Sequence, residues 1–167
     1  PEMPIISASI TGRTPYPVIQ TDPEELVFDP IEMGETDALS LTVKNAGDAN
    51  LELDLLHLAG SASDEFAFQS ACAIITPSEN CEITVTFTPI SPGTRTATLL
   101  IYSNDPELPE LPISLEGRTP SSRLEIQRDV LDFGIVPIGN LASEQLVLKN
   151  TGERTLTISA ISISGTH

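Results

Sequence analysis

The stretch Gly117-Arg118-Thr119-Pro120 repeats Gly12-Arg13-Thr14-Pro15, which lies 105 positions earlier in the chain. The same offset continues without a gap from residues 26–60 to residues 131–165, where it matches glycines and apolar residues alike. A repeat of this length is too long for one unit of a solenoid and has the size of a complete β-sandwich domain. The matched pairs include Phe28 with Phe133, Leu41 with Leu146, Asn45 with Asn150 and Gly47 with Gly152.

The repeat divides the chain into three parts. Residues 1–15 correspond to the last strand of a preceding repeat, residues 16–119 to a complete repeat, and residues 120–167 to the N-terminal half of a following repeat. The chain begins with proline and not with methionine. We therefore expect a piece of a longer tandem array, with one complete domain between parts of two others.

Apolar and polar residues alternate along the complete repeat, which is the pattern of half-buried β-strands. The apolar parity slips once between Leu53 and Leu56, and it slips at the same place in the second copy, so we expect a bulge or a bend there. Together these features predict an all-β protein built of immunoglobulin-like antiparallel β-sandwiches in tandem repeats. The clearest alternating runs are residues 39–43, 83–87 and 111–115.

The chain is strongly acidic, with 24 Asp and Glu against 8 Lys and Arg and a net charge of −16. Such a surface repels phosphate backbones and anionic lipid headgroups, so we expect neither nucleic-acid binding nor membrane insertion. The acidic residues are scattered rather than gathered in a tail, which favours a solvated surface. A calcium-dependent or high-salt environment is the alternative interpretation.

Cys72 and Cys81 are the two cysteines of the chain, and both fall in the complete repeat. Three interpretations are open: a disulfide, two buried thiols, or a metal site. The metal interpretation lacks further ligands, because His57 has the parity of an exposed strand residue and His167 is the last residue. A disulfide would indicate an oxidising compartment.

The sequence contains few candidates for catalytic or metal-binding residues. The sequence has no nucleophile elbow, phosphate loop or zinc motif, and we predict that it is not an enzyme. Asp105 lies in a Ser-Asn-Asp-Pro turn, where it is expected to accept bonds from nearby amides or to serve as a calcium ligand. Asp29 and Glu32, in an acidic cluster with Glu24 and Glu25, are two further weak calcium candidates. We expect no other cofactor.

We predict that the repeated Gly-Arg-Thr-Pro segment is a linker between domains. Arg13 and Arg118 are candidates for contacts with acidic groups of the neighbouring domain, and a linker without such contacts fits the sequence equally well. The turn at residues 45–48 contains Gly47, which we expect to adopt a positive φ.

One set of stretches forms a recognisable pattern: residues 131–139, 148–152, 81–89, 101–106 and 112–117, together with Cys72. In these residues the chain resembles the abnormal-spindle/Hydin-type domain, which is related to the choice-of-anchor D repeats and to the major-sperm-protein fold. The resemblance extends over nearly the whole chain, although Asp29 stands where the family pattern prefers glycine. It implies a non-catalytic immunoglobulin-like sandwich, found in eukaryotic cilia and centrosomes and in large bacterial surface proteins.

Three functions are compatible with this interpretation. The first is a structural stalk or filament of a large secreted or surface protein, extracellular or periplasmic and of bacterial type, whose partners are neighbouring repeats of the same protein. The second is an adhesion module that binds protein or glycan, and the third is an accessory domain of a secreted hydrolase. Residues 4–12 and 121–167 expose strand edges, so self-association by strand complementation is a further hypothesis.

Overall fold

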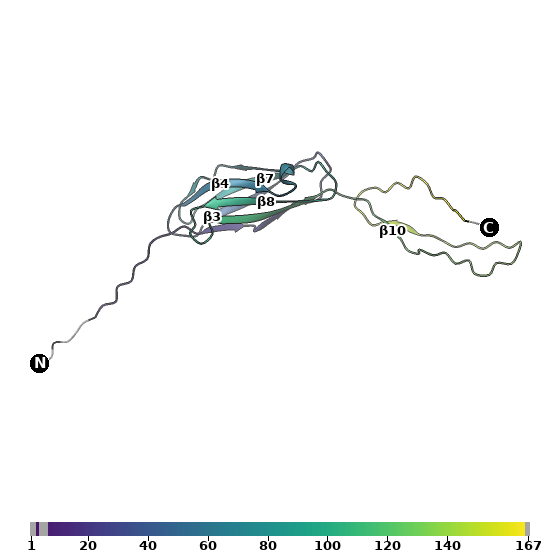
Figure 1. Ribbon diagram of the computed structural model, residues 1–167, viewed down its shortest axis with the longest axis horizontal. Coiled ribbons are helices and arrows are strands. Elements are labelled where there is room, and N and C mark those ends of the chain that lie inside the picture. The colour runs from purple at the N-terminus through teal and green to yellow at the C-terminus, as the bar shows by residue number, and fades with distance from the viewer. Residues whose placement is uncertain (1–2, 4–6, 166–167) are drawn as a thin grey trace.

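The structure is a computed structural model that describes residue 3 and residues 7–165. Two sheets pack over the middle of the chain, with strand orders β1-β3-β7-β5 and β2-β9-β8-β4-β6 (Figure 1). The predicted immunoglobulin-like sandwich is confirmed, and the described residues contain no α-helix that could cross a membrane. The elements are β1 (Ile19–Asp22), β2 (Glu25–Val27), β3 (Asp37–Asn45), β4 (Leu51–Ala59), the 3-10 helix η1 (Ser63–Glu65), β5 (Phe66–Ser70), β6 (Ile74–Ile75), β7 (Asn80–Phe87), β8 (Thr94–Ser103), β9 (Glu110–Arg118), β10 (Leu124–Ile126) and β11 (Leu148–Asn150).

The core forms where the inner faces of the two sheets meet. Alternate residues of β3, β7, β8 and β9 are buried, as the period-two pattern predicts. Phe87 is fully buried, and its ring lies 4.8 Å from that of Phe66 and 5.5 Å from that of Phe28, centroid to centroid. These three rings join both sheets at the centre of the sandwich, since Phe28 follows β2 and the other two rings belong to the opposite sheet.

The first two strands belong to different sheets. β1 pairs antiparallel with β3, whereas β2 pairs parallel with β9, beside residues 114–116. The parallel pair is an exception to the predicted antiparallel arrangement, and it arises because the entering segment crosses between the sheets after Asp22. The chain enters the sandwich at one end and leaves it at the opposite end (Figure 1).

The predicted irregularity in β4 is confirmed. Its pairing with β8 shifts register between Leu53 and Leu55, so the strand contains a bulge at the place where the apolar parity slips. His57 lies beyond the bulge and is exposed, as its parity predicts.

Residues 120–165 form a two-stranded ribbon beyond the sandwich. β10 pairs with β11 so that Leu124 lies opposite Asn150, and β1 pairs with β3 so that Ile19 lies opposite Asn45. The two registers differ by the offset of 105 that the sequence shows. The ribbon therefore has the local pairing that opens the complete sandwich.

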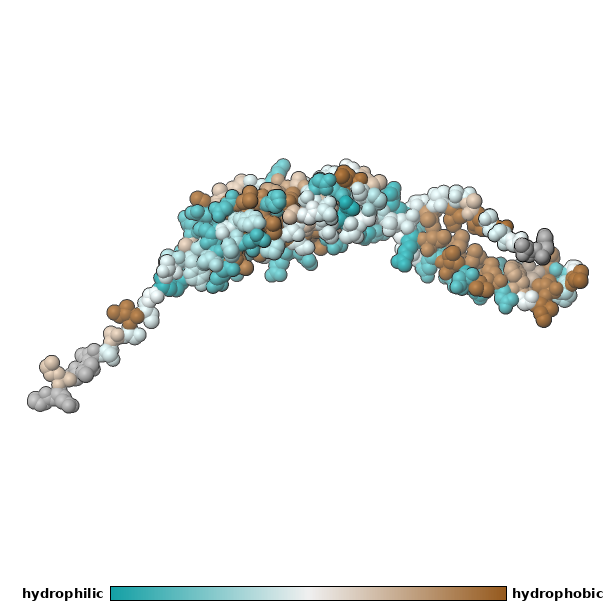
Figure 2. Space-filling view, in the orientation of Figure 1, coloured by the Kyte–Doolittle hydropathy of each residue, from teal (hydrophilic) through white to brown (hydrophobic). Residues whose placement is uncertain are grey.

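The apolar side chains of this ribbon remain uncovered. Phe133 is 49% exposed where Phe28 is 2% exposed, and Leu146 is 40% exposed where Leu41 is fully buried. Figure 2 shows hydrophobic surface gathered along the C-terminal part of the chain. The difference follows from the architecture, because within the described residues no second sheet faces the ribbon.

Candidate domain-junction interface

The turn at residues 45–48, which we call the junction loop, is organised by a buried asparagine at the end of β3. Asn45 is fully buried, and its side chain uses both its acceptor and its donor. Its amide thereby fixes the loop and ties it to the chain that enters β1. Oδ1 accepts from the amides of Gly47 (3.0 Å) and Val18 (3.4 Å), and Nδ2 donates to the carbonyls of Ala49 (2.7 Å) and Ile75 (2.9 Å).

The prediction that Gly47 adopts a positive φ is wrong. Positive-φ glycines in the described residues are found elsewhere, and Gly47 is required for a different reason. A Cβ on Gly47 would lie 2.6 Å from the amide nitrogen of Val18, so only glycine lets the entering backbone pass this closely. Gly152 repeats the arrangement, since its Cβ would lie 2.5 Å from the amide nitrogen of Arg123.

Arg13 reaches the junction loop from the linker. Its guanidinium forms a salt bridge with the carboxylate of Asp48 and lies 6.0 Å from the centre of the Tyr16 ring. Two hydrogen bonds also join Asp48 and Tyr16, one to the side chain of Asp48 and one between the backbones. The amide of Tyr16 donates to Asp48 Oδ1 (3.0 Å), and the amide of Asp48 donates to the carbonyl of Tyr16 (3.1 Å). The linker is therefore bonded to the complete domain that follows it.

The same contact recurs at the other end of this domain. Arg118 is the last residue of β9, and its two terminal nitrogens donate to the carboxylate of Glu153 at 2.5 and 2.6 Å. The amide of Glu153 donates to the carbonyl of Ser121 at 2.7 Å. Asn150 repeats the role of Asn45. Its Oδ1 accepts from the amides of Gly152 (3.0 Å) and Arg123 (3.2 Å), and its Nδ2 donates to the carbonyl of Arg154 (2.7 Å).

A second salt bridge joins the ribbon to the sandwich. Arg154 Nη2 lies 3.3 Å from Glu32 Oε2, and Glu32 belongs to the loop between β2 and β3. Sequence reasoning named Glu32 only as a calcium candidate and missed its partner. For the partners of Arg13 and Arg118, the usable signal was the repeat itself, because an acidic residue follows each repeated glycine, at positions 48 and 153.

The arginines lower the pKa values of both loop carboxylates. The hydrogen bond from Arg13 is the main cause of the low pKa of Asp48, and the amide of Tyr16 contributes further. The hydrogen bond from Arg118 likewise lowers the pKa of Glu153, while Glu153 raises the pKa of Arg118. Because folding lowers both carboxyl pKa values, their contribution to stability is present above the unfolded-state values, near pH 4, and is lost as the pH falls through the folded-state values.

We predict that the pKa of each of the two carboxylates, Asp48 and Glu153, depends on its own arginine partner. In a carboxyl-carbon NMR titration of the whole chain, Arg13→Ala should raise the pKa of Asp48 towards its ordinary value and leave that of Glu153 unchanged. Arg118→Ala should do the reverse. If neither substitution moves the pKa of its partner carboxylate, the two salt bridges do not exist in solution.

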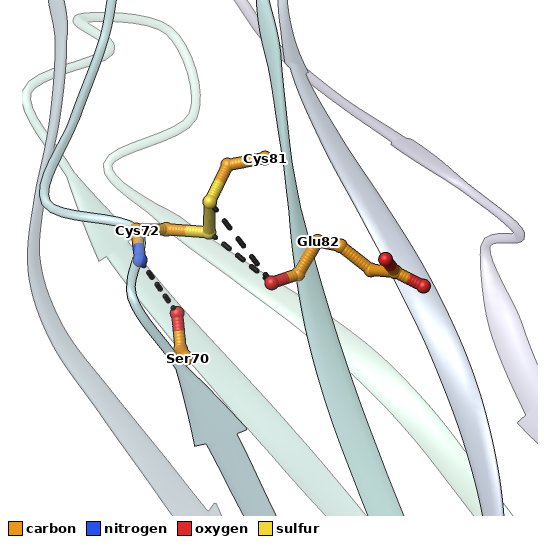
Figure 3. Close-up of a disulfide and its surroundings, with 4 residues drawn as sticks. All are labelled: Ser70, Cys72, Cys81 and Glu82. Atoms are coloured by element: carbon orange, nitrogen blue, oxygen red, sulfur yellow. Dashed lines mark hydrogen bonds between the residues drawn. A yellow bond between two sulfur atoms is a disulfide. The ribbon is translucent and has the colours of Figure 1, made fainter.

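Cys72 and Cys81 form a disulfide, which selects one of the three interpretations open from the sequence. It joins the segment after β5 to the start of β7, with the two Cα atoms 5.8 Å apart (Figure 3). The amide of Cys72 donates to Ser70 Oγ at 3.1 Å. Both half-cystines pack against the core, so the bond closes one end of the sheet that contains β5 and β7.

Removing the disulfide should have a moderate effect on stability. The bond closes a short loop, nine residues apart in sequence, and loop-closure entropy predicts a loss of about 2–3 kcal/mol in the free energy of unfolding for the double variant Cys72→Ser/Cys81→Ser. Urea denaturation followed by circular dichroism measures this loss. Reduction of the natural chain with dithiothreitol should give a similar loss, and an unchanged denaturation midpoint in both cases would contradict the prediction.

The calcium candidates Asp105 and Glu32 have different partners in the structure. Asp105 is 2% exposed, and its carboxylate accepts from the amides of Ile19 (2.8 Å), Glu107 (2.9 Å) and Leu108 (3.2 Å). Glu32 is engaged with Arg154. In the described part of the chain, no group of three or more His, Cys, Asp or Glu is arranged to hold a metal, and calcium binding stays a prediction.

Two face-to-face sheets, an entering segment that crosses from one sheet to the other and a junction loop at one end define an immunoglobulin-like domain. The family model named Cep192 domain 4 matches residues 16–119, the range that the sequence predicts for the complete repeat. The chain therefore belongs to this family. The finer assignment to the abnormal-spindle/Hydin type stays a prediction. No curated protein matches the chain.

Solved structures share the fold at low sequence identity. A protein of unknown function from Porphyromonas gingivalis W83 is similar with a TM-score of 0.54 and 19% identity, over 61% of this chain and 46% of that one. PapD-like domain 7 of human CEP192 has a TM-score of 0.49 and 17% identity, over 71% of this chain and 97% of that one. The chain thus spans less than half of the Porphyromonas protein. Identity this low shows similarity of fold alone.

Proposed function

We propose that the chain is a non-catalytic structural segment of a tandem array, in which immunoglobulin-like domains joined end to end form a stalk or filament. The observation that carries the proposal is the recurrence of one junction. An arginine of the Gly-Arg-Thr-Pro segment bonds to the acidic residue of a junction loop at Asp48 and again at Glu153. Entry and exit at opposite ends of the sandwich favour an extended arrangement (Figure 1).

We propose further that the protein is exported to the cell surface, the extracellular space or the periplasm, as the sequence analysis expects for a bacterial protein. The disulfide supports this location, because such bonds persist in oxidising compartments. The acidic surface keeps neighbouring arrays apart by charge repulsion. Mass spectrometry of the natural protein without prior reduction tests the location, since a cytosolic protein should retain both thiols.

The stalk is tested by small-angle scattering on the natural protein and on versions with fewer copies of the repeat. A stalk requires the maximum dimension to grow by about the same length with each added copy. A compact particle, in which the dimension grows far more slowly than the copy number, would overturn the stalk and favour domains that dock on one another.

One observation favours the second function, a binding module. A shallow groove of about 540 Å³ lies between β1 and the start of β9, lined by residues that include Thr21, Leu108 and Pro112. β2 covers only residues 114–116 of β9, so the earlier part of that strand has an open edge. The amide of Ile19 points away from β3 to Asp105, and by strand alternation the backbone of Thr21 faces the groove as well.

An extended peptide is the ligand that such an edge would accept, by addition of a strand. Amide NMR shifts of the whole chain, recorded with a set of extended peptides and with a glycan panel, test this. Shifts confined to residues 19–24 and 108–113 would support peptide binding at the groove, and an unresponsive groove would overturn it.

Two further roles are compatible with the sequence. An accessory role beside a hydrolase requires a catalytic domain elsewhere in the protein. Self-association by strand complementation would place residues 4–12 of one copy against the uncovered ribbon of another; residues 4–6 lie outside the described part of the chain. A variant that lacks residues 1–13 tests it in analytical ultracentrifugation, where an unchanged oligomeric state would reject the hypothesis.

A further inference from the structure

The two ends of the complete domain carry complementary parts of one interface. At its N-terminal end lies the junction loop, which holds the incoming backbone and offers an acidic side chain. At its C-terminal end lies Arg118, the last residue of β9, which bonds to the acidic side chain of the next loop. A surface that differs at the two ends of a unit generates a head-to-tail, heterologous contact, which extends without closing.

We propose that the junction loop is a docking site for the C-terminal end of a preceding copy of the same domain. A second contact, which differs between the two junctions of this chain, sets the stiffness of each junction. This inference rests on the proposed tandem array and adds the partner, the contact residues and a difference between junctions. The shared contact consists of the arginine, the acidic residue and the glycine past which the backbone enters.

The downstream junction has a second ionic contact. Arg154 pairs with Glu32, which lies in the loop between β2 and β3. This loop runs beside the end of β9, where the amide of Ile31 donates to the carbonyl of Arg118 at 3.2 Å. Ion pairs to two segments of the sandwich, the end of β9 and the loop before β3, restrict twisting more than a single ion pair, which leaves rotation about itself. The upstream loop has Ala49 at the position that corresponds to Arg154, so the same salt bridge cannot form there.

The upstream junction uses a different second contact. Tyr16 provides a ring beneath the guanidinium of Arg13, whereas the corresponding residue of the downstream junction is Ser121. A cation–π contact acts on the same arginine and adds no separate point of attachment. We therefore expect the upstream junction to twist more freely than the downstream one.

Exposed salt bridges contribute little to stability on their own, so the expected effect is on local order and orientation. The pair at Arg118 is bidentate, which gives it directional character. It also supports a turn that already has backbone bonds, from Glu153 to Ser121 (2.7 Å) and from Thr151 to Arg123 (2.8 Å). Loss of the pair should loosen this turn without unfolding the sandwich.

The test uses hydrogen exchange and residual dipolar couplings on the whole chain. Arg118→Ala should raise the exchange rates of the amides of Thr151 and Glu153 by about two- to fivefold, the range expected for loss of an exposed ion pair. Amides of the sandwich core should exchange as before. The couplings of residues 121–126 should shrink relative to those of the sandwich, because the ribbon then samples more orientations.

The matched control is Arg128→Ala. Arg128 pairs with Glu144 at 3.3 Å inside the ribbon, so its loss removes an exposed Arg–Glu pair that does not cross the junction. The exchanged pair Arg118→Glu/Glu153→Arg should restore the natural couplings. Arg154→Ala should also reduce the couplings, and an added Ala49→Arg substitution in the upstream loop should not restore them. Equal effects of Arg118→Ala and Arg128→Ala, or no recovery in the exchanged pair, would overturn the proposal.

The outcome is separable from that of the proposed stalk. Hydrogen exchange and couplings examine one junction within this chain, whereas scattering examines the whole array. An ordered junction in a compact array would overturn the stalk alone, and a rod-like array with an insensitive Arg118 would overturn this inference alone.

Discussion

Replacing Phe87 with alanine should lower the free energy of unfolding by about 3–5 kcal/mol. The ring is fully buried between the two sheets and contacts both Phe28 and Phe66. It also lies against Gly117, where an added Cβ would come within 2.6 Å of the ring. Alanine leaves a cavity that touches β2, β5 and β9, and these strands cannot all move inwards to fill it.

The measurement is urea denaturation of the whole chain, followed by circular dichroism. Ile90→Ala is the control, because Ile90 is 64% exposed and should cost well under 1 kcal/mol. Should Phe87→Ala fail to fold, Phe87→Leu keeps the site apolar and should lose less stability than alanine. A loss from Phe87→Ala no larger than that from Ile90→Ala would show that the ring is not at the core.

Replacing Asn45 with aspartate should lower the free energy of unfolding by about 2–4 kcal/mol near neutral pH. The substitution keeps the shape of the side chain and removes its two donated hydrogen bonds, to Ala49 and Ile75. It also places a negative charge against both of these carbonyl oxygens, in a site without solvent exposure. The loss should shrink at low pH, because a protonated carboxyl can again donate one hydrogen bond.

Asn150→Asp is the matched control for this substitution. Asn150 makes the equivalent bonds to Gly152 and Arg154 but is exposed, so water can replace the lost donor. We expect a loss below about 1 kcal/mol for Asn150→Asp. Equal losses at the two positions would show that burial does not distinguish the two copies of the loop.

The fold could be predicted because its determinants are local and repeated. Alternation in residues 39–43 and 83–87 sets the inward faces, and the parity slip near Leu53 marks the bulge. The parallel pairing of β2 with β9 could not be predicted, because it depends on where the entering segment crosses from one sheet to the other. No periodicity in residues 16–28 records that crossing.

The candidate site was only partly predictable. The arginines stand out because the Gly-Arg-Thr-Pro segment repeats, but their partners Asp48 and Glu153 lie 35 residues away in sequence and differ in type. The role of Gly47 was misjudged, because glycine in a turn suggests a positive φ, whereas here a neighbouring backbone excludes a side chain. Glu65 was missed as well. It is a buried carboxylate whose partner, Arg95, comes close only when β8 packs beside η1.

The pairing of β2 with β9 bears on how the protein would withstand tension. These neighbours run in the same direction, one near the entry of the domain and the other at its exit. A pull on the two ends would slide the strands past each other, so their hydrogen bonds would share the load instead of opening one by one. A chain of such domains would resist stretching until whole strands slip.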